Sequence, residues 1–166
     1  MPDDKQILIY AYGNPGRQDD GLGNRFVEKI GEWIRKENLP NIDRESNYQL
    51  NIEDAETISG KDIVIFVDAS DEDIEDFRLS EVTPSEGRPE FTTHAASPSF
   101  ILTLCRRLFN KYPRTYLLQI RGYKWEFMEG LSAGAEKNLA MALDFIQKKL
   151  TDKMFLEEIP TGQNTR

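Results

Sequence analysis

The sequence contains very little cysteine and histidine. Its 166 residues include one cysteine, Cys105, and one histidine, His94. A single cysteine cannot form an internal disulfide, which excludes a disulfide scaffold and favours a reducing compartment, so we expect a cytoplasmic protein. Apolar runs are also short, and none approaches the ~20 residues of a transmembrane helix. The acidic first residues do not resemble a signal peptide. We therefore expect no membrane partner.

Positive charge is scarce as well. Lys and Arg total 21 against 29 Asp and Glu, which gives a net charge of -8. This balance argues against electrostatic binding to nucleic acid or to an anionic membrane. Hydrophobic residues make up 39% and charged residues 30% of the chain, which excludes a disordered or collagen-like chain. We expect one domain over residues 1–160 and a polar tail over residues 161–166.

Three apolar runs predict buried strands. Residues 6–12 and 62–68 are rich in Ile, Val and aromatic residues without polar alternation, and residues 115–120 are similar. Continuous runs of this kind are typical of parallel strands that are covered on both faces.

Two further segments predict weaker strands. Residues 46–52 alternate, with Tyr48, Leu50 and Ile52 on one face, as in an edge strand. Residues 77–82 predict a fifth strand, whose direction the pattern does not define.

Helical periodicity predicts three amphipathic helices and one short helical turn. The first helix covers residues 20–37, the second begins at Ser97-Pro98, and the last begins at Ser132, while the turn lies at residues 54–58. The expected inward-facing residues are Leu22, Phe26, Ile30, Trp33 and Ile34 in the first helix, Phe100, Ile101, Leu104, Cys105 and Leu108 in the second, and Ala135, Leu139, Ala142, Ile146 and Leu150 in the last.

The alternation of strands and helices predicts the fold class. We expect an α/β protein, a single three-layer sandwich with a mainly parallel central sheet flanked by helices, as in phosphorylase- and hydrolase-like folds. Ligands of such folds bind at the C-terminal ends of the strands. This rule indicates the loop at residues 13–23, the loop at residues 68–76 and the segment before Ser97.

The first of these loops contains two adjacent carboxylates. Asp19 is placed to cap the following helix, so an Asn at this position is expected to cost little, whereas Asp20 needs another role. The loop is not a P-loop, because no Gly-Lys-Ser/Thr follows, and it lacks the dinucleotide fingerprint.

Two other residues are candidates for the same edge of the sheet. Asp68 ends an apolar strand, where it either serves as a ligand or bonds the backbone near Ser70 in a turn. His94 precedes a capped helix. Together with Asp20 these side chains would form an open oxygen and nitrogen site, which suits a divalent transition metal. A Ser-His-Asp triad is less favoured, because no Ser sits on a strand-to-helix elbow.

These motifs resemble those of the hydrogenase maturation endopeptidases over about residues 7–146. The matching positions are Gly13-Asn14, Asp19-Asp20, Gly21 and Gly23, then Val67-Asp68-Ala69, His94, Ile120-Arg121-Gly122, Glu126-Phe127 and Gly130-Leu131-Ser132. Two features depart from the family pattern: Asp20 stands where many members have Glu, and residues 71–77 are unusually acidic.

The resemblance implies an α/β protease that removes the C-terminal extension of a nickel-iron hydrogenase large-subunit precursor after nickel insertion. It assigns nickel recognition and catalysis to Asp20, Asp68 and His94. The nickel arrives in the substrate, and Zn or Cd are expected surrogates. The implied substrate-binding loop contains Gly13, Asn14, Gly21 and Gly23. Two mechanisms stay open: the metal activates the carbonyl or a water, or Asp68 acts as general base.

Two alternative functions are less favoured by the sequence. The run Gly13-Asn14-Pro15-Gly16 also resembles the start of peptidyl-tRNA hydrolases, but the Thr-Arg-His-Asn segment of that family is replaced by Arg17-Gln18-Asp19-Asp20. The acidic net charge also disfavours a tRNA substrate. The other alternative is a non-catalytic relative that binds a metal or a partner.

Overall fold

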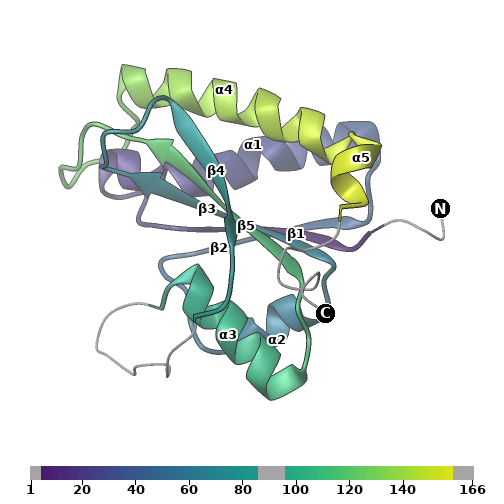
Figure 1. Cartoon of the computed structure of the whole chain (residues 1–166). Coiled ribbons are helices and arrows are strands. Elements are labelled where there is room, and N and C mark those ends of the chain that lie inside the picture. Colours follow the sequence, from purple (N-terminus) through teal and green to yellow (C-terminus); the bar gives the residue numbers. More distant parts are fainter. Residues whose placement is uncertain (1–4, 86–95, 159–166) are drawn as a thin grey trace.

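The computed structural model describes residues 5–85 and 96–158. Within these residues, five strands form one sheet in the order β2-β1-β3-β5-β4 (Figure 1). Strands β2, β1, β3 and β5 run parallel, and β4 is antiparallel to β5. The strands are β1 (Ile7–Tyr12), β2 (Ile42–Asn47), β3 (Ile63–Ser70), β4 (Phe77–Val82) and β5 (Arg114–Arg121). The predicted tail, residues 161–166, lies outside the described residues.

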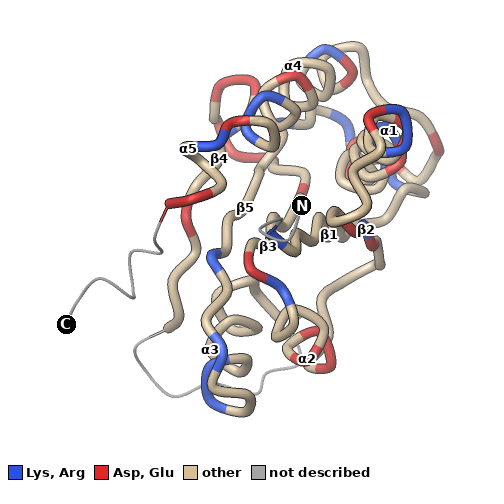
Figure 2. Tube along the Cα trace, turned by 90° about the vertical axis from the view of Figure 1, so that its right-hand side faces the viewer, with Lys and Arg blue, Asp and Glu red and all other residues tan. Residues whose placement is uncertain are grey.

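Helices cover both faces of this sheet. Helices α1, α4 and α5 pack on one face, and α2 and α3 on the other, which gives the predicted three layers (Figures 1 and 2). The helices are η1 (Gln18–Gly21), α1 (Leu22–Glu37), α2 (Asp54–Ser59), α3 (Pro98–Phe109), α4 (Ala133–Leu150) and α5 (Lys153–Leu156). No described helix has the length and hydropathy to cross a membrane.

The continuous apolar runs occupy the central strands, as predicted. Along β1, Ile7 and Ile9 face α1 and α4, whereas Leu8 and Tyr10 face α2 and α3. Because both faces of β1 and β3 are covered by helices, apolar side chains are needed at every position. Strands β1 and β3 therefore lack the alternation of apolar and polar residues that is typical of a half-exposed strand.

The predicted helix starts at Ser97-Pro98 and Ser132 are confirmed, whereas the first helix begins at Leu22, after the 3-10 turn η1, and not at residue 20. The Ser97 hydroxyl accepts a hydrogen bond from the Phe100 amide at 3.1 Å, and the Ser132 hydroxyl accepts one from the Ala135 amide at 3.2 Å. The inward residues of α4 are all buried. In α3 the prediction for Leu108 is wrong, since this side chain is 66% exposed. Residues 106–111 are all exposed, so the last turn of α3 extends beyond the core.

The predicted edge strand at residues 46–52 is also wrong. Strand β2 ends at Asn47, and of the three apolar residues expected on one face only Leu50 is buried, while Tyr48 and Ile52 are 73% and 54% exposed. Parallel pairing with β1 already begins at Ile42, soon after α1 ends. Backbone pairing defines this polar edge strand, and its side chains carry no apolar alternation that could have located it.

The strand order places a topological switch point between β1 and β3. From β1 the chain passes through α1 to β2 on one side, and it then enters β3 on the other side of β1. In open α/β sheets, ligands bind near such a switch point, at the C-terminal ends of the strands.

Candidate active site

The loops that follow β1 and β3 bring Asp20 and Asp68 together at the switch point. Asp20 lies in η1, and Asp68 lies near the C-terminal end of β3. Gly23 explains how the loops approach, because a Cβ at this position would lie 2.8 Å from the backbone oxygen of Val67. The first turn of α1 thus packs directly on the end of β3. The Asp20 charge acts on the Asp68 carboxyl and raises its pKa.

The loop around Asp20 is tightly folded. The Asp20 Oδ2 atom accepts a hydrogen bond from the Asn14 amide at 2.9 Å, and the Asn14 side chain accepts one from the Gly16 amide at 2.8 Å. Gly13 has a φ of +147°, and a Cβ there would lie 2.2 Å from the backbone oxygen of Asp20. A Cβ at Gly21 would lie 2.7 Å from the Cα of Pro15. These glycines have packing roles in the loop, and their contact with substrate stays a prediction.

Asp68 is a desolvated carboxyl. Its pKa is raised to about 7, first by burial and next by the negative charge of Asp20. Hydrogen bonds from the Ala69 amide and the Tyr12 hydroxyl act in the opposite direction and are weaker. Burial and the charge of Asp68 also raise the pKa of Tyr12, which therefore stays protonated and donates to the carboxylate. Residues 68–70 belong to β3 and form no turn, so of the alternative interpretation only the bond from the neighbouring Ala69 amide is present.

The prediction that Asp19 caps the following helix is wrong. Helix α1 begins after Gly21 and receives no side-chain cap. The Asp19 side chain instead points into the protein, is 0% exposed, and accepts hydrogen bonds from Tyr123, Lys124 and Ser132. Burial acts to raise its pKa, but these hydrogen bonds outweigh burial and hold the pKa below its ordinary value. Asp19 is therefore an ionised internal anchor.

The third predicted site residue, His94, lies outside the described residues, so its position relative to the two aspartates stays a prediction. In the described part of the chain, no group of three or more His, Cys, Asp or Glu side chains is arranged to hold a metal ion. Cys105 is fully buried in the core, as predicted, and burial raises the pKa of its thiol to about 11 despite the nearby charge of Lys111. This thiol has no role in the site.

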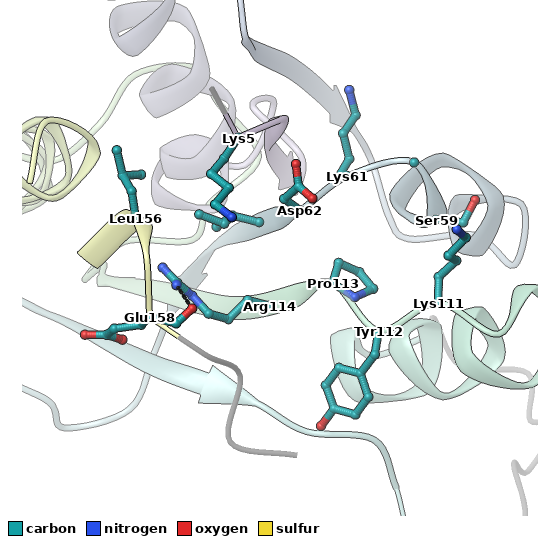
Figure 3. Close-up of a pocket in the computed structure, with 12 residues that line it drawn as sticks. Lys5, Ser59, Lys61, Asp62, Lys111, Tyr112, Pro113, Arg114, Leu156 and Glu158 are labelled. Carbon is teal, nitrogen blue, oxygen red and sulfur yellow. Dashed lines mark hydrogen bonds between the residues drawn. The ribbon is translucent and has the colours of Figure 1, made fainter. Parts of the chain in front are cut away.

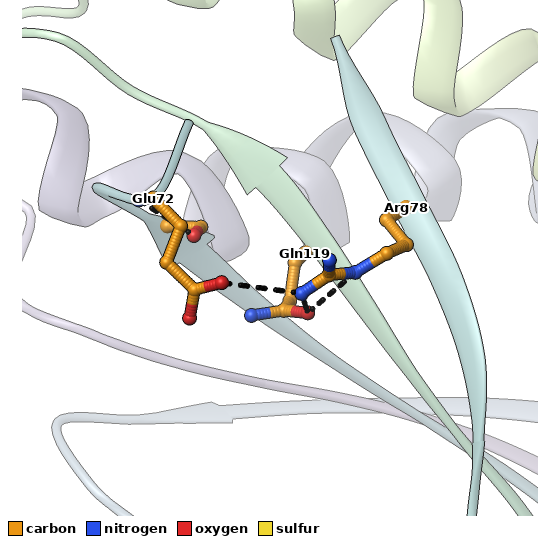
Figure 4. Close-up of polar contacts among 4 residues, drawn as sticks. Glu72, Arg78 and Gln119 are labelled. Carbon is orange, nitrogen blue, oxygen red and sulfur yellow. Dashed lines mark hydrogen bonds and ion pairs between the residues drawn. The ribbon is translucent and has the colours of Figure 1, made fainter. Parts of the chain in front are cut away.

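The acidic loop beside the site is partly neutralised by arginines. The Arg78 guanidinium contacts Glu72 at 3.3 Å and Gln119 at 2.8 Å (Figure 4). Arg121 contacts Asp73 at 2.9 Å. The Arg78–Glu72 pair is exposed and Arg121 is half-buried beside a fully exposed Asp73, so each ion pair contributes little to stability. They hold the segment after β3 against β4 and β5.

Two cavities lie near opposite ends of the sheet. One, of about 490 Å³, adjoins the Asp20 loop and lies between it, α1 and residues 129–136; its lining includes Pro15, Gln18, Gly21 and Asn24. The other, of about 420 Å³, is lined by Lys5, Lys61, Lys111 and Arg114 (Figure 3). Arg114 begins β5, so this basic cavity lies at the N-terminal edge of the sheet, away from both aspartates. Neither Asp20 nor Asp68 lines either cavity, and the first cavity is the one that adjoins the Asp20 loop.

The chain is similar to known proteins in its structure and not in its sequence. No family model and no curated protein sequence matches the chain. Among solved structures, the [NiFe] hydrogenase maturation protease HycI from Thermococcus kodakarensis is similar with a TM-score of 0.69 at 19% identity, covering 90% of this chain and 96% of that one. The hydrogenase maturating endopeptidase HybD from E. coli gives a TM-score of 0.62 at 19% identity, covering 87% and 91%. The chain has the hydrogenase maturation protease fold.

A third structure supports this assignment of the maturation protease fold. The hydrogenase 2 maturation peptidase from a Thaumarchaeota archaeon gives a TM-score of 0.63 at 18% identity and covers 88% of this chain and 98% of that one. The fold expected from the sequence, an α/β sandwich with a mainly parallel sheet, is thereby confirmed.

Within the maturation protease fold, two features of the site were not found in the sequence. Tyr12 appeared only as the end of a buried strand, although its hydroxyl contacts Asp68. The segment 122–132 appeared only through its resemblance to a family motif. Its contact with Asp19 joins residues more than a hundred positions apart, and no local pattern reports such a contact.

Proposed function

We propose that this chain is an endopeptidase that removes the C-terminal extension of a nickel-iron hydrogenase large-subunit precursor after nickel insertion, in the cytoplasm. The observation that carries the proposal is the convergence of Asp20 and Asp68 at the switch point of a maturation protease fold. In the proposed site, His94 supplies the third ligand, and the precursor brings the nickel.

The electrostatics of Asp68 explain why a cation would be recognised. Burial and the charge of Asp20 both disfavour the ionised form of this carboxyl. A divalent cation between the two carboxylates would remove both penalties, because it attracts each charge and replaces the lost solvation. Carboxylate oxygens with one imidazole nitrogen form a ligand set that suits nickel and its surrogates Zn and Cd.

The same residues can support hydrolysis in two ways. The substrate nickel can polarise the scissile carbonyl or lower the pKa of a bound water. Alternatively Asp68 can accept a proton from the attacking water, for which a pKa of about 7 is well matched to neutral pH. In either case the hydrogen bond from Tyr12 orients the Asp68 carboxylate.

The charge of the protein supports selection by nickel. With a net charge of -8 and two carboxylates in the site, the enzyme repels a free peptide carboxylate. A bound nickel ion gives the folded precursor a positive centre at the place where the enzyme is negative. We therefore propose that nickel marks the precursor as ready for cleavage.

The decisive experiment compares nickel-loaded and nickel-free precursor. The protein is incubated with each form, and loss of the C-terminal extension is followed by mass spectrometry. Cleavage of the loaded form alone is expected, and Asp20→Asn should abolish it because an amide is a neutral and weaker metal ligand. Asp144→Asn, which alters an exposed aspartate of α4, is the matched control and should cleave normally. Binding of the precursor without cleavage would indicate the non-catalytic alternative.

A further inference from the structure

A continuous seam of hydrogen bonds joins the Asp20 loop to the segment 122–132. The Asp19 amide donates to the Lys124 carbonyl at 3.0 Å, and the Gln18 amide donates to the Met128 carbonyl at 2.9 Å. The Arg17 guanidinium donates to the Trp125 carbonyl at 3.1 Å. These bonds pair the two segments along their backbones although neither belongs to the sheet.

The Asp19 carboxylate is the centre of this seam. It accepts the amides of Tyr123, Lys124 and Ser132 at 2.7, 3.0 and 2.8 Å, and the hydroxyl of Ser132 at 2.7 Å. All four partners donate, and hydrogen bonds to an ionised acceptor are stronger than those to a neutral one. An Asn at this position would present an NH₂ group to some of these donors. The site therefore requires a carboxylate, unlike a helix cap, where Asn serves as well as Asp.

Packing around Asp19 is equally restrictive. A Cβ at Gly122 would lie 2.6 Å from the Asp19 Cβ and 2.9 Å from the Trp125 ring. On the other side of the seam, Gln18 adopts a φ of +47°, which is unfavourable for a residue with a side chain. Such a conformation persists because the surrounding contacts hold it, so release of the seam would also release the backbone of η1.

The seam lies one residue away from the candidate ligand Asp20. Asp19 and Asp20 share the single turn of η1, in which the Asp20 amide donates to the Arg17 carbonyl at 3.1 Å. Because the Asp19 side chain points into the protein, the Asp20 side chain, which follows it in the same turn, points in a different direction. A shift of Asp19 therefore moves Asp20 relative to Asp68.

We propose that Asp19 is a positioning residue, which locks the segment 122–132 against η1 and thereby holds Asp20 in the geometry required at the carboxylate site. This inference rests on the proposed function for its kinetic consequence, and it adds a role for a residue that touches neither nickel nor substrate. It also reverses the expectation that Asp19→Asn is nearly silent.

The test compares two ways of opening the seam. Asp19→Asn removes the carboxylate, and Gly122→Ala inserts a methyl group against it while every carboxylate is kept. Asp152→Asn is the matched control, because Asp152 is an exposed helix cap that accepts from the Met154 amide. Hydrogen exchange at residues 122–132 measures how firmly the seam is closed. Cleavage of the nickel-loaded precursor gives kcat and KM. Calorimetric titration with Cd²⁺ alone gives the metal affinity, which depends on the geometry of the ligands.

Both seam variants should exchange faster at residues 122–132 and bind Cd²⁺ more weakly, and their kcat should fall by about a hundredfold while KM changes far less. The control should match the wild type. Unchanged exchange in both variants would overturn the anchor, and fast exchange with unchanged Cd²⁺ affinity and kcat would overturn the positioning role. If the wild type itself does not cleave the precursor, the proposed function fails, and exchange and Cd²⁺ affinity still decide the role of Asp19.

Discussion

Replacement of Asp68 by Asn should stabilise the protein at neutral pH. The folded state raises the pKa of this carboxyl from its ordinary 3.8 to about 7, so the folded protein binds the proton more tightly than the unfolded chain does. The contribution of Asp68 to the free energy of unfolding therefore falls as the pH rises from about 4 to about 7, and it is constant above that range. A rise of this size corresponds to about 4 kcal/mol, which is an upper figure because the side chain retains some solvent contact.

The assay is equilibrium unfolding by urea, followed by circular dichroism at several pH values between 4 and 8. Other titrating groups are common to both proteins, so the difference between Asp68→Asn and wild type isolates this carboxyl. That difference should shift in favour of the variant by up to about 4 kcal/mol across the range. Asp144→Asn controls for the loss of one negative charge. Parallel pH curves for wild type and Asp68→Asn would refute the reasoning that Asp68 is destabilised by desolvation and by Asp20.

Four other perturbations test the site. Cd²⁺ affinity in titration calorimetry should weaken as the pH falls below about 7, where Asp68 holds its proton, and His94→Ala should abolish binding without altering the urea midpoint. Tyr12→Phe removes a hydrogen bond that lowers the pKa of Asp68, so the acid limb of the cleavage pH profile should move to higher pH. Gly23→Ala places a methyl group 2.8 Å from the Val67 oxygen and should cost about 1–3 kcal/mol in urea unfolding.

For each of the three substitutions, one outcome would contradict the prediction. Unchanged Cd²⁺ affinity in His94→Ala would remove this residue from the ligand set. An unmoved acid limb in Tyr12→Phe would show that the hydroxyl does not act on Asp68. A wild-type urea midpoint in Gly23→Ala would show that the start of α1 does not need its close approach to β3.

The sequence predicted those parts of the fold that depend on local chemistry. Continuous apolar runs identified β1 and β3, because burial on both faces demands apolar side chains along the strand. Ser97 and Ser132 identified two helix starts, because a cap is recognised within three residues of sequence. Strand β2 was missed, since its position depends on backbone pairing with β1 and its own residues are polar.

In the site, too, the sequence predicted the features that have a local signal and missed those that depend on distant contacts. Asp68 was found because a carboxylate near the end of an apolar strand is a local feature with a known place in the fold. Asp19 was misassigned, since its position at the start of a helix suggested a cap while its partners lie in the segment 122–132. A desolvated neighbour such as Tyr12 is likewise recognised only when the strands are assembled.

The Asp19 seam also has a consequence for the order of folding. Strand β1 and helix α1 lie in the first quarter of the chain, but the donors to Asp19 follow β5, the last strand. Contacts of such high sequence separation form late, because the loop that they close must first be ordered. During synthesis, β1, α1 and β3 can begin to assemble while Asp19 has no partners and η1 is unsupported. The Asp20 loop therefore gains its final geometry only after Ser132 has been synthesised. A chain that ends before this residue contains Asp20 and Asp68 but no completed site.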